Sequence, residues 1–193
     1  MIRPAVVSLA ARIAFVASLA STGVAAADRP AAVGWYAEGG LGATKFVGKV
    51  AKDADLGPAL DLHVGRDLFS WLAVGVVVEA SSHQATVPPP PVGEFFQLYR
   101  GAAEARLAGR LDRFGGFLEG GAGATMISSN ILGQVKITDP GEHFSILFFA
   151  GAGIEYQLEN RHYAVGLAGD GFLVPQFSAM RALDGRAFLR YTY

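Results

Sequence analysis

The chain of 193 residues is long enough for one domain of ordinary size, and 51% of its residues are apolar while 17% are charged. A formal net charge of −1 leaves no basic footprint for nucleic acid, and the absence of cysteine excludes disulfide bonds and lipid attachment through a thiol. After the N-terminus the sequence has no uninterrupted apolar run of the roughly 20 residues that a membrane-spanning helix needs.

The N-terminal segment has the order of a secretory signal peptide. Arg3 and Arg12 precede an apolar stretch, and small residues follow it up to Ala27. The apolar stretch is too short to cross a membrane as a helix. We therefore expect cleavage after Ala27, with a signal peptide over 1–27, a mature domain over 28–193, and export to the periplasm or the outer membrane.

The mature chain repeats segments of about ten residues that are rich in glycine, valine, alanine and aromatic residues and are separated by turn residues. This is the length of a tilted transmembrane strand. Strands are predicted near 34–45, 58–67, 71–83, 95–111, 116–128, 143–158, 161–173 and 181–193. An even set of eight strands predicts an all-β, antiparallel, up-and-down barrel that crosses a membrane.

The predicted connections alternate in length. Short ones lie at 67–70, 112–115 and 159–160, and long ones at 46–57, 83–94, 129–142 and 174–180. Outer-membrane barrels have short periplasmic turns on one rim and long extracellular loops on the other. The alternation therefore predicts the same two rims here, with both termini on the periplasmic side.

Apolar and polar residues alternate along the predicted strands. Val74, Val76 and Val78 share one face of their strand, whereas Glu79 lies on the other. A half-buried strand of a soluble barrel shows the same alternation, so a soluble periplasmic barrel stays open as an alternative. Aromatic residues near the strand ends are expected to form interfacial girdles. These residues are Trp35, Trp71, Tyr99, Phe117, Tyr163 and Tyr191.

The last strand alternates up to the final residue. Leu189, Tyr191 and Tyr193 share one face, and Arg186 and Arg190 lie on the other. This ending resembles the C-terminal signal by which outer-membrane barrels of Gram-negative cells are recognised for assembly, although the last residue there is most often Phe. The resemblance implies that the barrel-assembly machinery binds this strand.

The inward-facing positions collect charges of both signs. They are Glu38, Asp61, His63, Glu79, Arg100, Glu104, Arg106, Arg110, Glu119, Glu155, His162, Asp170, Arg186 and Arg190. An eight-stranded barrel is only wide enough for side chains to fill it, so these groups have to pair. We predict a lumen plugged by ion pairs, without an open pore. A gated proton or ion path and a paired-carboxylate active site are the functional alternatives.

A signal peptide followed by about eight alternating strands with an aromatic end resembles the small outer-membrane barrels of the OmpA-transmembrane, OmpX and OmpW kind. The resemblance covers the mature chain, and no peptidoglycan-binding domain is expected after Tyr193. It implies a porin-like, monomeric protein in the outer membrane of a Gram-negative cell, in contact with lipid. Members of this superfamily act in surface interaction, in passage of hydrophobic molecules, or in lipid modification.

One pair of residues permits a test of the enzymatic alternative. His143 and Ser145 form an H-x-S pair similar to that of outer-membrane lipid A deacylases, in which histidine activates serine. Ile146 stands where that family usually has Asn, and Glu155 is the nearest acid. The facing pattern directs Ser145 to the lumen, whereas an acyl-chain hydrolase needs it towards lipid. We therefore expect no catalytic site.

The remaining histidines lack metal-ligand spacing, so no metal or cofactor is expected. His63 and His162 are interpreted as lumen residues and His83 as a loop residue. The second long connection contains Pro88–Pro91, which stiffens an exposed loop or binds a partner. The sequence thus predicts a monomer with a structural or surface-interaction role and an extracellular ligand, if any, at the loops. Lipid modification and a narrow passage for small or hydrophobic solutes are the alternatives.

Overall fold

A computed structural model describes residues 33–86, 95–128 and 143–193 of the chain. The predicted signal peptide, the Pro88–Pro91 run and the predicted loop at 129–142 lie outside the described residues. The signal peptide and its cleavage after Ala27 therefore remain a prediction.

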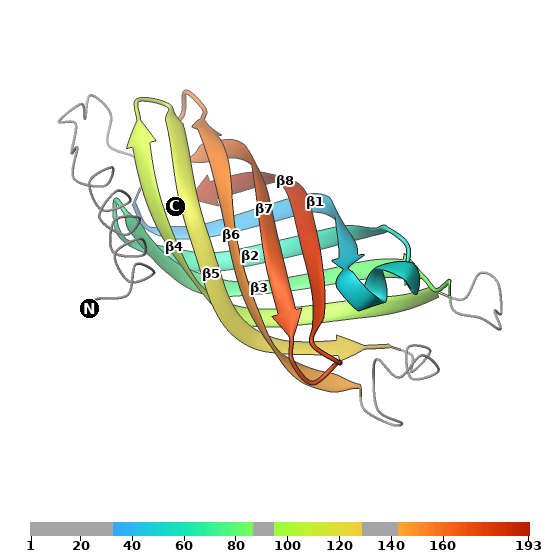
Figure 1. The fold of residues 1–193 in the computed structure, drawn as a ribbon. Helices are drawn as coiled ribbons and strands as arrows, with labels where there is room; N and C mark the ends of the chain where they lie inside the picture. The colour runs from blue at the N-terminus through green and yellow to red at the C-terminus, as the bar shows by residue number, and fades with distance from the viewer. Residues whose placement is uncertain (1–32, 87–94, 129–142) are drawn as a thin grey trace, which may run out of the picture.

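The described chain forms a closed barrel of eight antiparallel strands in sequence order (Figure 1). The strands are β1 (Trp35–Val47), β2 (Gly57–Phe69), β3 (Leu72–Gln84), β4 (Phe95–Leu111), β5 (Phe114–Ile127), β6 (Phe144–Gln157), β7 (Tyr163–Val174) and β8 (Met180–Thr192). The barrel closes where β1 pairs with β8, from Tyr36↔Thr192 to Val47↔Arg181. The predicted fold class is confirmed, and each predicted strand overlaps an observed one.

The connections lie on two rims, and the predicted alternation in length fails for the last pair, because 158–162 and 175–179 are equally long. The hairpins β2–β3, β4–β5 and β6–β7 are joined by 70–71, 112–113 and 158–162, on the rim that also holds the C-terminus (Figure 1). The opposite rim carries the 3-10 helix η1 (Gly48–Lys52) and a turn at 175–179 between β7 and β8. We call the first rim the short-turn rim and the second the long-loop rim.

The barrel is apolar outside, and nearly all charged side chains of its strands point inside, which is the reverse of a soluble protein. Leu60, Val76 and Leu118 are 59%, 55% and 59% exposed, whereas Glu38 and Arg106 are 0% and 1% exposed. A β-barrel in lipid satisfies all its backbone groups between strands and presents apolar side chains outward. The outer surface is therefore suited to hydrocarbon and not to water. None of the described helices is long and apolar enough to cross a membrane.

Aromatic residues gather at the short-turn rim. Trp35, Trp71 and Tyr163 are exposed there, and the rings of Tyr163 and Tyr191 lie 4.8 Å apart. The predicted girdle position of Phe117 is wrong, because this side chain is 4% exposed and lies in the lumen. Phe117 has the same parity along β5 as the inward Glu119, and parity decides the face even close to a strand end.

Glycines make room for the large inward side chains. A Cβ added at Gly153 would lie 2.3 Å from Cζ of Phe117 and 2.8 Å from a backbone oxygen of β7, and one at Gly166 would lie 2.4 Å from Cζ of Phe188. None of these three distances is compatible with a real Cβ atom. At Gly101, on the outer face, a Cβ would meet nothing within 4 Å.

The crowding at Gly153 and the open space at Gly101 predict that Gly153→Ala destabilises the barrel whereas Gly101→Ala does not. The added methyl group at Gly153 has to displace both Phe117 and the backbone of β7, which costs about 1–3 kcal/mol for an overpacked core. The measurement is the urea midpoint at which the folded, faster-migrating band is lost on an unheated gel. Equal midpoints for the two variants would contradict this account of the lumen.

Candidate functional site

The lumen contains two stacked layers of different chemistry. The half nearer the short-turn rim is filled by an ionic layer, and the half nearer the long-loop rim by an apolar layer. The ionic layer consists of Glu38, Asp61, His63, Glu79, Arg100, Glu104, Arg106, Glu119, Asp170, Asp184 and Arg186, all at most 9% exposed. The apolar layer consists of Phe46, Val50, Ala54, Ala85, Phe96, Leu98, Ala102, Ile127, Leu147, Phe149, Phe172, Val174, Phe177, Met180 and Ala182.

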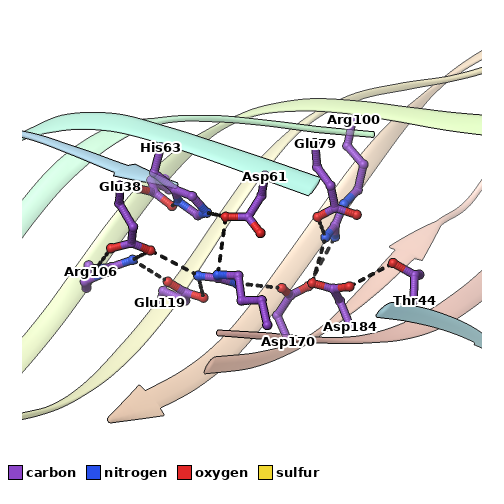
Figure 2. Close-up of polar contacts among 12 residues, drawn as sticks. Glu38, Thr44, Asp61, His63, Glu79, Arg100, Arg106, Glu119, Asp170 and Asp184 are labelled. Carbon is purple, nitrogen blue, oxygen red and sulfur yellow. Dashed lines mark hydrogen bonds and ion pairs between the residues drawn. The ribbon is translucent and has the colours of Figure 1, made fainter. Parts of the chain in front are cut away.

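Arg106 is the most deeply buried guanidinium in the ionic layer. It donates from Nη1 and Nη2 to the two carboxylate oxygens of Glu38 at 2.7 and 3.0 Å, and from Nη2 to Glu119 at 3.0 Å (Figure 2). Its Cζ lies 4.1 Å from the ring centroid of Phe117. A bidentate carboxylate pair together with an aromatic face satisfies a guanidinium well in a medium of low polarity.

Arg186 connects the same carboxylates to further acids. It donates to Glu119 at 2.7 Å and to Asp170 at 3.2 Å, and its nitrogens lie 3.8 Å from Glu38 and 3.7 Å from Asp61. Glu38 and Glu119 therefore each lie between two guanidiniums. The shared carboxylates couple strands β1, β4, β5 and β8 through side chains as well as through the backbone.

Arg100 forms a second centre, closer to the apolar layer. It pairs with Glu79, donates to Asp170 at 3.1 Å, and has an Nη2 atom 3.7 Å from Asp184. The hydroxyl of Thr44 donates to Asp184 at 2.8 Å (Figure 2). Asp170 thus accepts hydrogen bonds from both Arg100 and Arg186, which joins the two centres.

His63 lies between two carboxylates. Its Nδ1 is 2.9 Å from Glu104 and its Nε2 is 3.3 Å from Asp61. The hydroxyl of Tyr36 donates to the other oxygen of Glu104 at 3.0 Å. The chain from Tyr36 through Glu104 and His63 to Asp61 gives each of these groups a polar neighbour.

Smaller contacts close the lumen at the short-turn rim. Arg110 pairs with Glu155 and also donates to Gln157 at 3.0 Å. Arg190 donates to Asp67 at 2.5 Å, and its Cζ lies 3.9 Å from the ring centroid of Tyr36.

The structure brings the sequence-predicted lumen residues together with one exception. His162 was expected to face the lumen, but it is exposed in the connection between β6 and β7. Its Nδ1 lies 2.6 Å from the carbonyl oxygen of Thr192. The reason is that β7 begins only at Tyr163, so the inward alternation does not extend to His162.

Asp184 and Tyr36 are among the buried lumen residues that the sequence analysis did not include. Asp184 is 5% exposed and has the same parity along β8 as Arg186 and Arg190, so extending that alternation by one step would have found it. Tyr36 is 1% exposed, and its parity with Glu38 gave the same signal.

His83 was interpreted as a loop residue, and this is wrong. It lies in β3, fully buried, with ring centroids 4.6 Å from Phe46 and 5.4 Å from Phe96. Its Nδ1 donates to the carbonyl oxygen of Asp55 at 3.0 Å, and its Nε2 is 3.0 Å from the hydroxyl of Ser81. The predicted strand at 71–83 already contained His83, and His83 has the same parity along β3 as the inward Glu79, so the inward alternation continues to the end of the strand.

The apolar layer adds large apolar side chains to the inward charges that the sequence predicted. Phe46, Phe96, Leu98 and Ile127 point inward near the long-loop rim, each at most 1% exposed. At the boundary between the layers lies a cavity of about 10 Å³, bordered among others by Phe149. Such a space holds roughly one water molecule.

The structure does not assemble the H-x-S pair into a catalytic group. The Ser145 hydroxyl is buried on the lumen side and donates to the carbonyl oxygen of Ile146 at 3.0 Å. His143 donates from Nδ1 to the carbonyl oxygen of Ile127 at 3.2 Å, and Glu155 lies at the opposite end of β6 beside Arg110. Within the described ranges, no cluster of three or more His, Asp or Glu residues could hold a metal ion.

No protein-family model and no curated protein matches the sequence. Solved structures do match by fold. Neisserial surface protein A (NspA) aligns with a TM-score of 0.61 at 14% sequence identity, over 82% of this chain and 97% of that chain. The chain has the fold of the small outer-membrane β-barrels. The apolar exterior of this fold, with the charges inside the barrel, is that of a protein embedded in the outer membrane of a Gram-negative cell.

Two further solved structures of this kind are similar. The outer-membrane enzyme PagL aligns with a TM-score of 0.45 at 15% identity, over 82% of this chain and 99% of that chain. Ail, the attachment invasion locus protein of Yersinia pestis, aligns with a TM-score of 0.46 at 12% identity, over 82% of this chain and 98% of that chain.

The shared carboxylates predict that Arg106→Met destabilises the barrel by about 3–5 kcal/mol, because Glu38 and Glu119 are left as buried charges with one partner fewer. Adding Glu38→Gln to this variant should restore part of the loss. The matched control is Arg113→Met, which removes a rim cation whose partner Glu159 is largely exposed and should change stability by about 0–1 kcal/mol. Urea unfolding followed on unheated gels measures all three, and equal midpoints for Arg106→Met and Arg113→Met would contradict the role of the network.

Proposed function

We propose that this protein is a monomeric outer-membrane barrel with a sealed lumen and a structural or surface-interaction role. The observation that carries the proposal is the presence of two filled layers in series across the lumen. Each layer on its own opposes the passage of solutes, and neither contains an assembled catalytic group among the described residues.

The ionic layer opposes passage because its guanidiniums are already engaged. Arg106 and Arg186 share Glu38 and Glu119, and Arg100 holds Glu79 and Asp170. A hydrated ion that entered would have to break several of these buried pairs, each of which is costly to open.

The apolar layer opposes passage for a different reason. Phe46, Phe96 and Phe177 are fully buried there, and a hydrated ion gains no polar partner among them. A hydrophobic solute that passed this layer would meet the charges of the ionic layer next. The two layers thus exclude opposite classes of solute.

A rigid barrel with long connections on one rim is suited to present those connections outside the cell. The outward residues at the C-terminus support contact with lipid, since Leu189 of β8 and Tyr193, which follows β8, are 48% and 69% exposed. Recognition of Leu189, Tyr191 and Tyr193 by the barrel-assembly machinery is part of the same proposal.

The sealed lumen predicts that the purified protein gives no stable conductance steps in a planar lipid bilayer. The variant Phe46→Ser with Phe96→Ser should also stay closed, because the ionic layer remains in place behind the opened apolar layer. An open porin in the same bilayer serves as the positive control. Steady steps from the unmutated protein would overturn the proposal.

Catalysis is tested separately by expressing the chain in a Gram-negative host and measuring its lipid A by mass spectrometry. We expect the same acyl-chain pattern with the unmutated chain, with His143→Ala and with Ser145→Ala, because neither side chain contacts the other. Loss of an ester-linked acyl chain with the unmutated chain, restored by Ser145→Ala, would show that the protein is a lipid-modifying enzyme.

A further inference from the structure

Charges are rare on the outer face of the barrel. Among the strand residues that the structure describes, the charged side chains directed outward are Lys45, Arg66 and Arg181. Arg66 lies at the short-turn rim, with its Cζ 5.8 Å from the ring centroid of Trp35. Lys45 and Arg181 lie at the long-loop rim, and both are cations.

Lys45 and Arg181 are neighbours across the seam where the barrel closes. Lys45 pairs with Leu183 and Val47 pairs with Arg181, so the two cations occupy diagonal positions on the same face of β1 and β8. Such positions place Cβ atoms about 7–8 Å apart, within reach of long side chains. Neither cation forms an ion pair with another residue of the described part of the chain.

The helix η1 adds two more cations beside this pair. Lys49 and Lys52 are exposed, and η1 is held at the rim by the buried side chain of Val50. The nearest acids in sequence are Asp53, which is 6% exposed, and Asp55, which is exposed. No ion pair joins either of them to the described lysines.

Like charges at neighbouring positions repel, and the repulsion grows next to a medium of low polarity. An anion between the two side chains would remove this cost. The end of a membrane-embedded strand lies at the height of the lipid headgroups, which supply anions there. Clusters of basic residues next to a membrane surface bind such headgroups. A guanidinium and an ammonium together match the oxygens of a phosphate group.

We propose that Lys45 and Arg181 bind a phosphate group of an anionic lipid headgroup at the long-loop rim, and that Lys49 and Lys52 strengthen the attraction. The inference rests on membrane embedding and does not depend on a sealed lumen. A conducting barrel would leave it intact, and a failure to bind lipid would leave the sealed lumen intact.

The test uses the full chain folded in detergent micelles, with bisphosphorylated lipid A as the probe and native mass spectrometry to count bound lipid. Lys45→Gln with Arg181→Gln should weaken binding about thirtyfold, and each single variant about fivefold. The matched control Arg66→Gln removes one outward cation from the other rim and should leave binding unchanged. Lys45→Arg with Arg181→Lys keeps both charges and should keep most of the affinity.

Two further probes identify the source of the phosphate. Dephosphorylated lipid A should bind at least tenfold more weakly, and inorganic phosphate should not compete at equal concentration. Only variants that retain the heat-dependent gel shift of the folded barrel are compared. The proposal is overturned by unchanged binding in the double variant, by an equal loss with Arg66→Gln, by tight binding of the dephosphorylated lipid, or by competition from inorganic phosphate at equal concentration.

Discussion

The narrow lumen of an eight-stranded barrel is the constraint on which the rest of this structure depends. A barrel of this size has an interior that side chains can fill. The hydrocarbon outside cannot solvate polar groups, so the polar side chains have to lie inside. Each large inward side chain therefore needs a matching gap. Phe117 lies against Gly153, and Phe188 lies against Gly166, at positions where a methyl group would not fit.

The same constraint explains why the charges occur as a connected network and not as separate pairs. A single guanidinium and carboxylate would leave spare donors and acceptors in a medium that cannot solvate them. Because Glu38 lies beside both Arg106 and Arg186, these spare groups face one another. The network joins strands far apart in sequence, and Arg186 and Glu38 join the two strands that close the barrel.

Strand positions and facing could be predicted from the sequence because period-two alternation is a local property. Val76 and Glu79 have opposite parity, and one buried charge fixes the face of the whole strand. The facing of two residues was predicted wrongly, because it was inferred from where a strand begins or ends and not from the alternation inside the strand. Phe117 was assigned to a girdle by its place near a strand end, and His162 to the lumen because the predicted strand began two residues before β7 does.

The division of the lumen into two layers was not accessible from alternation. Phe96 and Arg100 have the same parity on β4, and only the three-dimensional register shows which inward residues of the other strands lie at the same height. Register between neighbouring strands is fixed by the hairpins and by the closure of the barrel, and closure is a property of all eight strands together. The sequence therefore indicated which side chains enter the lumen better than it indicated which of them meet.

The apolar layer relates the sealed lumen to the long-loop rim. Val50 of η1 and Phe177 of the β7–β8 turn belong to this layer, so parts of two connections pack inside the barrel. The carbonyl oxygen of Asp55 is held by His83, which lies between two rings of the same layer. Packing that fills the lumen therefore also fixes the β1–β2 connection and the β7–β8 turn at the long-loop rim. A chain that opened its lumen here would loosen η1 and the β7–β8 turn at the long-loop rim, and this links the closed lumen to the proposed role in surface interaction.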